Sequence, residues 1–168
     1  MKLVFAQHKL AIYTHVFASF LALSLGPFQF SRSLRKRKPV LHRYLGRIYL
    51  GIGVLLGGLA GLFLSYLAQG GAVAKLGFAV LALLWLYTGL RAYFAIRAGR
   101  IGQHRKWMIR NFSLTFAAVT LRLYLPIVIL LNFNFMNAYA LIAWLCWVPN
   151  LILAERVFNQ KKIQNTQQ

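Results

Sequence analysis

The sequence alternates between apolar stretches of about 20 residues and short clusters of basic residues. A stretch of this length and apolarity spans the hydrocarbon core of a lipid bilayer as an α-helix. Five such helices are predicted, over about residues 10–30, 43–68, 75–97, 111–131 and 138–158. No polar stretch between them is long enough to build a separate core. We therefore expect residues 1–168 to form one all-α domain, a polytopic membrane helix bundle.

The charge distribution predicts how this bundle lies in the membrane. The chain has 20 Lys and Arg residues and a single acid, Glu155, for a formal charge of +19. Cytoplasmic loops of membrane proteins carry an excess of Lys and Arg. The predicted loops on one side hold most of the cations: Arg32, Arg35, Lys36, Arg37, Lys38, Arg43, Arg47, Arg91, Arg97, Arg100, Arg105, Lys106, Arg110, Arg156, Lys161 and Lys162.

The opposite side of the predicted bundle holds only Lys2, Lys9 and Lys75. This asymmetry predicts an N-terminus outside and a C-terminus in the cytoplasm. The positive charge is therefore interpreted as membrane topology and as attraction to anionic headgroups on the cytoplasmic side, rather than as a nucleic-acid footprint. A homo-oligomer and a larger membrane complex are both compatible with such a chain.

A line of polar and small residues is predicted on the fourth helix. On a straight helix it would consist of His104, Met108, Asn111, Thr115, Ala118 and Arg122. Hydrocarbon does not solvate polar groups, so this line must face protein, a cavity or a ligand. Arg122 lies near the middle of the stretch, where an exposed cation costs at least about 2.5–3.5 kcal/mol.

The partner of Arg122 is the sharpest question that the sequence raises. Glu155 is predicted near the cytoplasmic end of the fifth helix, where it would pair within the cluster that includes Arg105 and Arg110. Arg122 would then face backbone carbonyls, water, His15 or a bound anion or quinone carbonyl. His15 lies inside the first predicted helix, and its alternatives are a hydrogen bond between helices or a role as ligand or proton carrier.

Two histidines are predicted at a shared depth near the cytoplasmic side. His42 is followed by Arg43 and Arg47, and His104 by Arg105 and Arg110, near the starts of the second and fourth helices. Cations at a helix N-terminus are unfavourable unless an anion is present. Lipid phosphates would supply one, and a dedicated headgroup or cofactor-carboxylate site is the alternative. A further hypothesis is that His42 and His104 jointly bind a metal or a haem iron.

Gly53, Gly57 and Gly61 recur at every fourth position of the second helix, a pattern typical of close helix packing and compatible with a slot for a flat cofactor. The sequence carries no Ser-His-Asp pattern, Gly-rich phosphate loop or Cys/His zinc spacing, so an enzymatic activity is neither predicted nor excluded. The leading hypothesis is a redox or binding protein that holds haem b, a quinone or an anionic lipid. The alternatives are a small transporter or assembly partner without cofactor, and a structural bundle.

Several motifs carry a family resemblance: Gly26-Pro27-Phe28-Gln29-Phe30, Leu41-His42-Arg43-Tyr44-Leu45-Gly46-Arg47-Ile48-Tyr49, His104-Arg105-Lys106-Trp107-Met108-Ile109-Arg110, Leu114-Thr115-Phe116-Ala117-Ala118-Val119-Thr120-Leu121-Arg122, and Asn150-Leu151 with Glu155. From about His15 to Glu155 the chain resembles the predicted bacterial membrane proteins called domain of unknown function 2306. The resemblance implies a polytopic protein of a bacterial cytoplasmic membrane and lends no activity. Many such proteins are longer at the N-terminus, which implies one helix more in those relatives.

Overall fold

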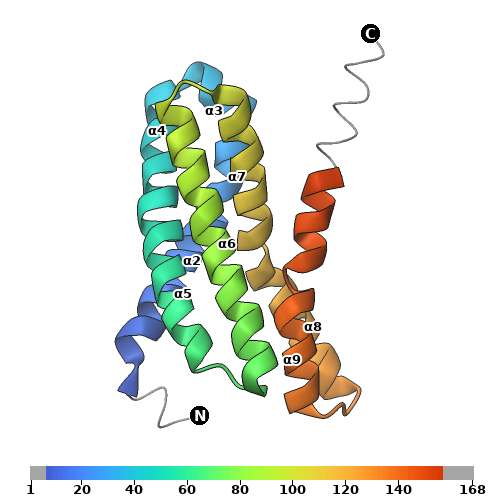
Figure 1. The fold of residues 1–168 in the computed structure, drawn as a ribbon. Coiled ribbons are helices and arrows are strands. Elements are labelled where there is room, and N and C mark those ends of the chain that lie inside the picture. The colour runs from blue at the N-terminus through green and yellow to red at the C-terminus, as the bar shows by residue number, and fades with distance from the viewer. Residues whose placement is uncertain (1–6, 157–168) are drawn as a thin grey trace.

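The computed structural model describes residues 7–156, which form a bundle of helices (Figure 1). We call each passage of the chain from one end of the bundle to the other a crossing. The first and third crossings are the single α-helices α2 (Lys9–Phe30) and α6 (Gly71–Arg97). The second crossing consists of α4 (Pro39–Ile48), the π-helical segment η1 (Tyr49–Leu56) and α5 (Gly57–Tyr66). The fourth crossing consists of α7 (Ile101–Thr115) and α8 (Ala117–Leu130). The fifth begins as α9 (Phe135–Leu145) and is helical again over residues 148–156.

Within residues 7–156, five crossings are long and apolar enough to span a membrane, which confirms the predicted fold. They are Lys9–Phe30, Pro39–Tyr66, Gly71–Arg97, Ile101–Leu130 and Phe135–Arg156. The predicted end of the fifth helix at residue 158, and the cations Lys2, Lys161 and Lys162, lie outside the described residues. The orientation of the bundle across the membrane stays a prediction.

All five crossings begin earlier than predicted, the first by one residue and the fifth at Phe135 rather than 138. At the second and fourth crossings, charged residues were taken as loops. The second crossing starts at Pro39 rather than 43, the third at Gly71 rather than 75, and the fourth at Ile101 rather than 111. The start of α7 is amphipathic: Met108 is buried while Arg105 is exposed. Most of the first basic loop is also helical, as the short α3 (Arg32–Arg37), whose N-cap Ser31 accepts a bond from the Leu34 amide.

The basic segments gather at one end of the bundle. Figure 1 shows α3, the start of α4 and the connection from α6 to α7 at the top, and the connections from α5 to α6 and from α8 to α9 at the bottom. We call the top, with α3 and the starts of α4 and α7, the basic end. This clustering is the arrangement on which the predicted orientation depends.

Small residues bring the first two crossings into close contact. A Cβ added at Gly53 would lie 2.9 Å from the Ala22 Cβ atom, and one added at Gly57 would lie 3.2 Å from that of Ala18. Helices in hydrocarbon gain no hydrophobic energy by associating, so close packing and polar bonds must hold them together. The glycine pattern of the second helix therefore serves helix packing, as its spacing predicted.

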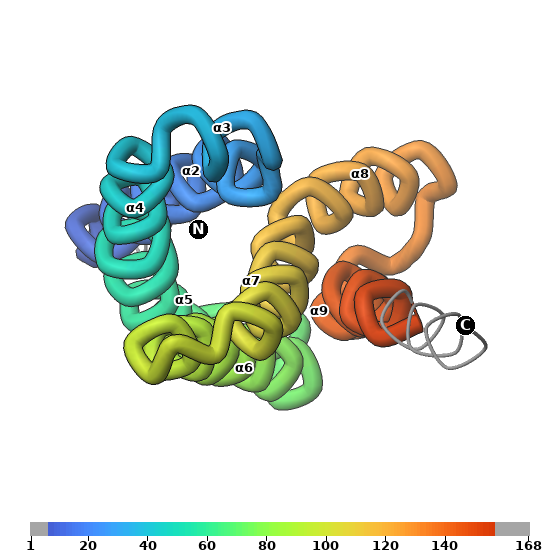
Figure 2. The backbone as a smooth tube through the Cα atoms, turned by 90° about the horizontal axis from the view of Figure 1, so that it is seen from above, coloured from blue at the N-terminus to red at the C-terminus, as the bar shows by residue number. Residues whose placement is uncertain are grey.

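The fourth crossing is not straight. Phe116 interrupts it, and α8 leaves the line of α7 and packs mainly on α9 (Figure 2). The interruption needs no proline: Thr115 bonds back to the Asn111 carbonyl, and the Val119 amide bonds to the Phe116 carbonyl in a tight turn. The break in the fifth crossing, at residues 146–147, instead precedes Pro149, which lacks the N–H that would continue the helix.

Candidate functional site

A network of buried polar side chains lies where η1, α6 and α7 meet. The Tyr49 hydroxyl donates to Asn111 Oδ1 at 2.7 Å and lies 3.2 Å from Thr115 Oγ1. Trp85 Nε1 donates to Thr115 Oγ1 at 2.9 Å. Asn111 Nδ2 donates to the Trp85 carbonyl oxygen at 2.7 Å and to Thr88 Oγ1 at 2.9 Å. All five side chains are buried, so the network ties three crossings together away from water and lipid.

A cavity of about 420 Å³ lies beside this network, in the half of the bundle away from the basic end. Side chains of α2, α5, α6, α8 and α9 line it, together with Leu114, Thr115 and Ala117 at the break of the fourth crossing. Most of the lining is apolar or glycine, including Gly57, Gly58 and Gly61. Trp85 and Thr115 belong to both the network and the cavity wall, so one face of the cavity is rigidly held.

His15 projects from α2 into this cavity with one ring nitrogen already engaged. Its Nδ1 lies 2.9 Å from the Gly57 carbonyl oxygen. A carbonyl oxygen can only accept, so Nδ1 carries the proton, and in the neutral ring the lone pair is on Nε2. A Cβ added at Gly61 would lie 2.9 Å from the His15 Cε1 atom, so this glycine leaves room for the ring. The hydrogen bond between helices is present, and Nε2 keeps the capacity to accept.

Arg122 lines the same cavity from α8. Its side chain is exposed, its Nη1 donates to the Ala118 carbonyl at 2.8 Å, and its charge is close enough to act on His15. The predicted line from His104 to Arg122 is not straight, because α8 leaves α7 at Phe116, but its members Thr115, Ala118 and Arg122 all line the cavity. The exposed side chain of Arg122 marks where the cavity meets the surface.

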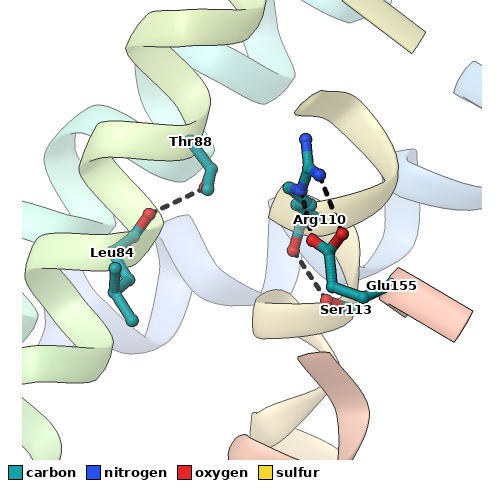
Figure 3. A network of polar contacts seen from close by, with 5 residues as sticks. All are labelled: Leu84, Thr88, Arg110, Ser113 and Glu155. Atoms are coloured by element: carbon teal, nitrogen blue, oxygen red, sulfur yellow. Dashed lines mark hydrogen bonds and ion pairs between the residues drawn. The ribbon is translucent and has the colours of Figure 1, made fainter. Parts of the chain in front are cut away.

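Glu155, the single acid of the chain, does not pair with Arg122. Glu155 pairs with Arg110 through the guanidinium Nε and through Nη2, the latter at 2.8 Å (Figure 3). The Arg110 guanidinium also lies over the Trp107 ring, 4.7 Å from its centroid, and Arg91 lies over the same ring at 4.9 Å. The predicted pairing of Glu155 with the basic cluster is confirmed. Within residues 7–156, Arg122 has no salt bridge to an acid.

The two histidines of the basic end are close enough for their charges to interact. His42 is the fourth residue of α4 and His104 the fourth of α7. His104 Nδ1 lies 2.8 Å from the Ala92 carbonyl oxygen, which fixes the start of α7 on α6. Arg43, Arg47 and Arg105 are exposed at this end.

The described residues contain no group of three or more His, Cys, Asp or Glu that could hold a metal ion. The joint metal or haem site of His42 and His104 would thus rest on two imidazoles alone, and it stays a hypothesis.

Sequence reasoning missed three members of the network and one buried amide at the basic end. Trp85 and Thr88 were not predicted to take part in a site, and Tyr49 and Gln29 were noted only as parts of motifs. The available signal was a polar or hydrogen-bonding side chain inside an apolar stretch. Such a group must find a protein partner in hydrocarbon.

Comparison with known proteins returns a family and no individual relative. No curated protein and no solved structure matches the chain. A family model described as a predicted membrane protein, DUF2306, matches residues 12–158, which include both histidines of the basic end, the network and the cavity. The chain therefore belongs to the DUF2306 family of predicted membrane proteins.

Proposed function

We propose that this membrane protein binds a lipophilic ligand with a carbonyl or oxyanion head, in the first instance a quinone, in the cavity between α2, α5, α6 and α8. The observation that carries the proposal is that His15 and Arg122 share one largely apolar cavity. Ligand sites are typically apolar concavities with a few polar groups that fix orientation. Here the two polar groups differ in what they offer, because Arg122 only donates and His15 Nε2 accepts.

The two redox forms of a quinone use these groups differently. The carbonyl oxygen of the oxidised form accepts from the Arg122 guanidinium, whereas a hydroxyl of the reduced form, the quinol, can also donate to His15 Nε2. The flat ring would lie among the apolar side chains that line the cavity, which include Leu81, Leu121 and Leu125. A cation inside a membrane is expensive without a partner, and within the described residues Glu155 is engaged by Arg110. An oxygen atom of a bound ligand would therefore give Arg122 the hydrogen-bond acceptor that Glu155 does not provide.

Trp85 makes the proposal measurable, because it lines the cavity and quinones quench indole fluorescence. The protein in mild detergent is titrated with decylubiquinone. We expect saturable quenching in the wild type and an affinity for decylubiquinone at least about tenfold lower, about 1.4 kcal/mol, in Arg122→Ala. In His15→Ala we expect a similar loss of affinity for decylubiquinol, measured by its competition with decylubiquinone. Arg100→Ala is the matched control, since Arg100 is an exposed cation in the connection between α6 and α7.

Quenching that does not saturate, or that neither cavity substitution weakens, would refute quinone binding. Displacement of the quinone by palmitate with equal affinity would make an anionic lipid the occupant instead.

Haem is the second candidate for the same cavity. The observation in its favour is the bond from His15 Nδ1 to a backbone carbonyl, the arrangement that orients metal-ligating histidines and leaves Nε2 for the metal. A visible spectrum of the purified, haem-supplemented protein tests it in the oxidised and reduced states. A Soret band that is lost in His15→Ala supports this candidate, and a featureless spectrum rejects it.

A further inference from the structure

Two buried nitrogen atoms at the basic end have no hydrogen-bond partner among the described residues. They are Nε2 of Gln29, a side chain only 6 % exposed, and Nδ1 of His42. Buried polar groups in native proteins are almost always bonded, and each exception calls for a physical explanation. These atoms lie at the other end of the bundle from the cavity of His15 and Arg122.

Gln29 and His42 both lie at the contact between α2 and α4. A Cβ added at Gly46 would lie 3.1 Å from Gln29 Oε1, so the Gln29 amide packs directly on this glycine. His42 precedes Gly46 by four residues and therefore occupies the same face of α4, one turn nearer its start. Gly46 keeps the space that the amide occupies.

The surrounding charges are all positive. Arg35 holds the main chain beside Gln29, because its Nη1 donates to the Gln29 and Phe30 carbonyl oxygens, both at 3.3 Å. Arg35 and His104 are the charged groups that act on His42. The one acid of the chain, Glu155, is bound by Arg110.

An amide nitrogen can donate but cannot bind a metal ion, and neighbouring cations repel one. The missing partner is therefore a hydrogen-bond acceptor, and the charges favour a negative one.

We propose that Gln29 and His42 form an oxyanion site, which takes a phosphate or carboxylate oxygen. Gln29 Nε2 donates to the anion, His42 donates through Nδ1, and Arg35 supplies positive charge. The ligand is a free anion or the phosphate of a lipid headgroup, since both present the same oxygens. The site stands whether or not the cavity of His15 and Arg122 binds a quinone.

The test is thermal unfolding of the purified full chain, followed by intrinsic tryptophan fluorescence. In a neutral maltoside detergent, potassium phosphate is titrated against potassium chloride at equal ionic strength. We expect a saturable rise in Tm with phosphate, because a ligand that binds only the folded state stabilises it. A second arm compares nanodiscs of phosphatidylcholine with nanodiscs that also contain phosphatidylglycerol.

Two substitutions of Gln29 give opposite signatures. In Gln29→Leu the donor is removed, so we expect the phosphate-dependent rise to disappear while Tm in chloride stays the same or increases. In Gln29→Glu the side chain itself carries the anionic oxygen, so we expect Tm in chloride to rise towards the wild-type value in phosphate, with no further response. Lys36→Ala is the control, since Lys36 is exposed on α3 and should leave the response intact.

Each outcome decides the proposal. A response to phosphate in detergent that needs Gln29 supports a free-anion site. A response to phosphatidylglycerol that needs Gln29, with none to phosphate, supports a lipid headgroup. No response to either, or a response that survives in both Gln29 variants, overturns the site.

Discussion

The Tyr49 hydroxyl donates a 2.7 Å hydrogen bond to Asn111 Oδ1, and both side chains are fully buried. This bond joins the first residue of η1 to the middle of α7. π-helical segments occur frequently at functional sites. Here the segment lies between Gly46, at the candidate oxyanion site, and Gly57, at the cavity.

The hydrogen-bond network around this bond stabilises the central part of the bundle, which we call the centre. Polar bonds and small-residue contacts, rather than apolar burial, must hold helices together in hydrocarbon. The centre contains both, with Tyr49 and Asn111 beside the close contact of Gly53 and Ala22. The two candidate sites lie on either side of it, one at the basic end and one where α8 departs from α7.

Removal of the Tyr49 hydroxyl tests the centre. Tyr49→Phe leaves the Asn111 Oδ1 acceptor buried without its donor, so we expect a loss of about 1–3 kcal/mol in the free energy of unfolding. Unfolding in mixed detergent micelles measures it. Tyr44→Phe is the matched control, because Tyr44 is 61 % exposed. Equal stability of the two variants would contradict the structural role of the network.

The close approach of α2 to η1 predicts a contrast between two neighbouring glycines. In Gly53→Ala the new methyl would lie 2.9 Å from the Ala22 Cβ atom and 3.2 Å from its backbone, so the helices must separate. We expect a loss of about 1–3 kcal/mol. Gly51 has no atom within 4 Å of its added Cβ, and Gly51→Ala should be neutral or stabilising by up to about 1 kcal/mol. The same unfolding assay compares them, and equal losses would mean that the contact is absent.

The five crossings were predictable from length and apolarity, and the helix starts were not. Ile101 to Arg110 was taken as a loop because it is charged, yet it is helical because one face packs on α6, where His104 bonds to the Ala92 carbonyl oxygen, and because Met108 is buried. Composition identifies a helix buried in lipid on all sides, but an amphipathic turn at the membrane surface depends on which side its neighbour occupies.

Some features of the two candidate sites could likewise be predicted from the sequence, and others could not. Arg122 and His15 could be singled out because an ionisable residue in an apolar stretch demands a partner. The sequence already offered His15 among the groups that Arg122 could face, and the two residues do line one cavity. The break at Phe116 could not be predicted, since it carries no proline or glycine signal. Gln29 was overlooked because only the position of Gly46 shows that its amide is buried.

The ion pair of Glu155 and Arg110 should contribute modestly. Its side chains are 41 % and 24 % exposed, and pairs of this kind typically contribute about 0.2–1 kcal/mol. A double-mutant cycle with Glu155→Gln and Arg110→Gln measures the coupling free energy without counting the contact of Arg110 with Trp107. A coupling energy of zero would show that the pair does not help to fix the fifth crossing.

Gly61→Ala tests whether the position of the His15 ring contributes to ligand binding separately from the charge of Arg122. Gly61→Ala adds a methyl 2.9 Å from His15 Cε1 and 3.0 Å from Nδ1, so the ring must move away from its bond to the Gly57 carbonyl. If His15 Nε2 helps to bind the ligand, its displacement should weaken the binding of decylubiquinol, measured by competition with decylubiquinone, by about tenfold, although no charged or polar side chain has changed. Gly51→Ala lies on the same crossing with open space around it and should leave the affinity unaltered. An unchanged affinity in Gly61→Ala, together with a loss in Arg122→Ala, would assign binding to Arg122 and leave His15 a purely structural hydrogen bond.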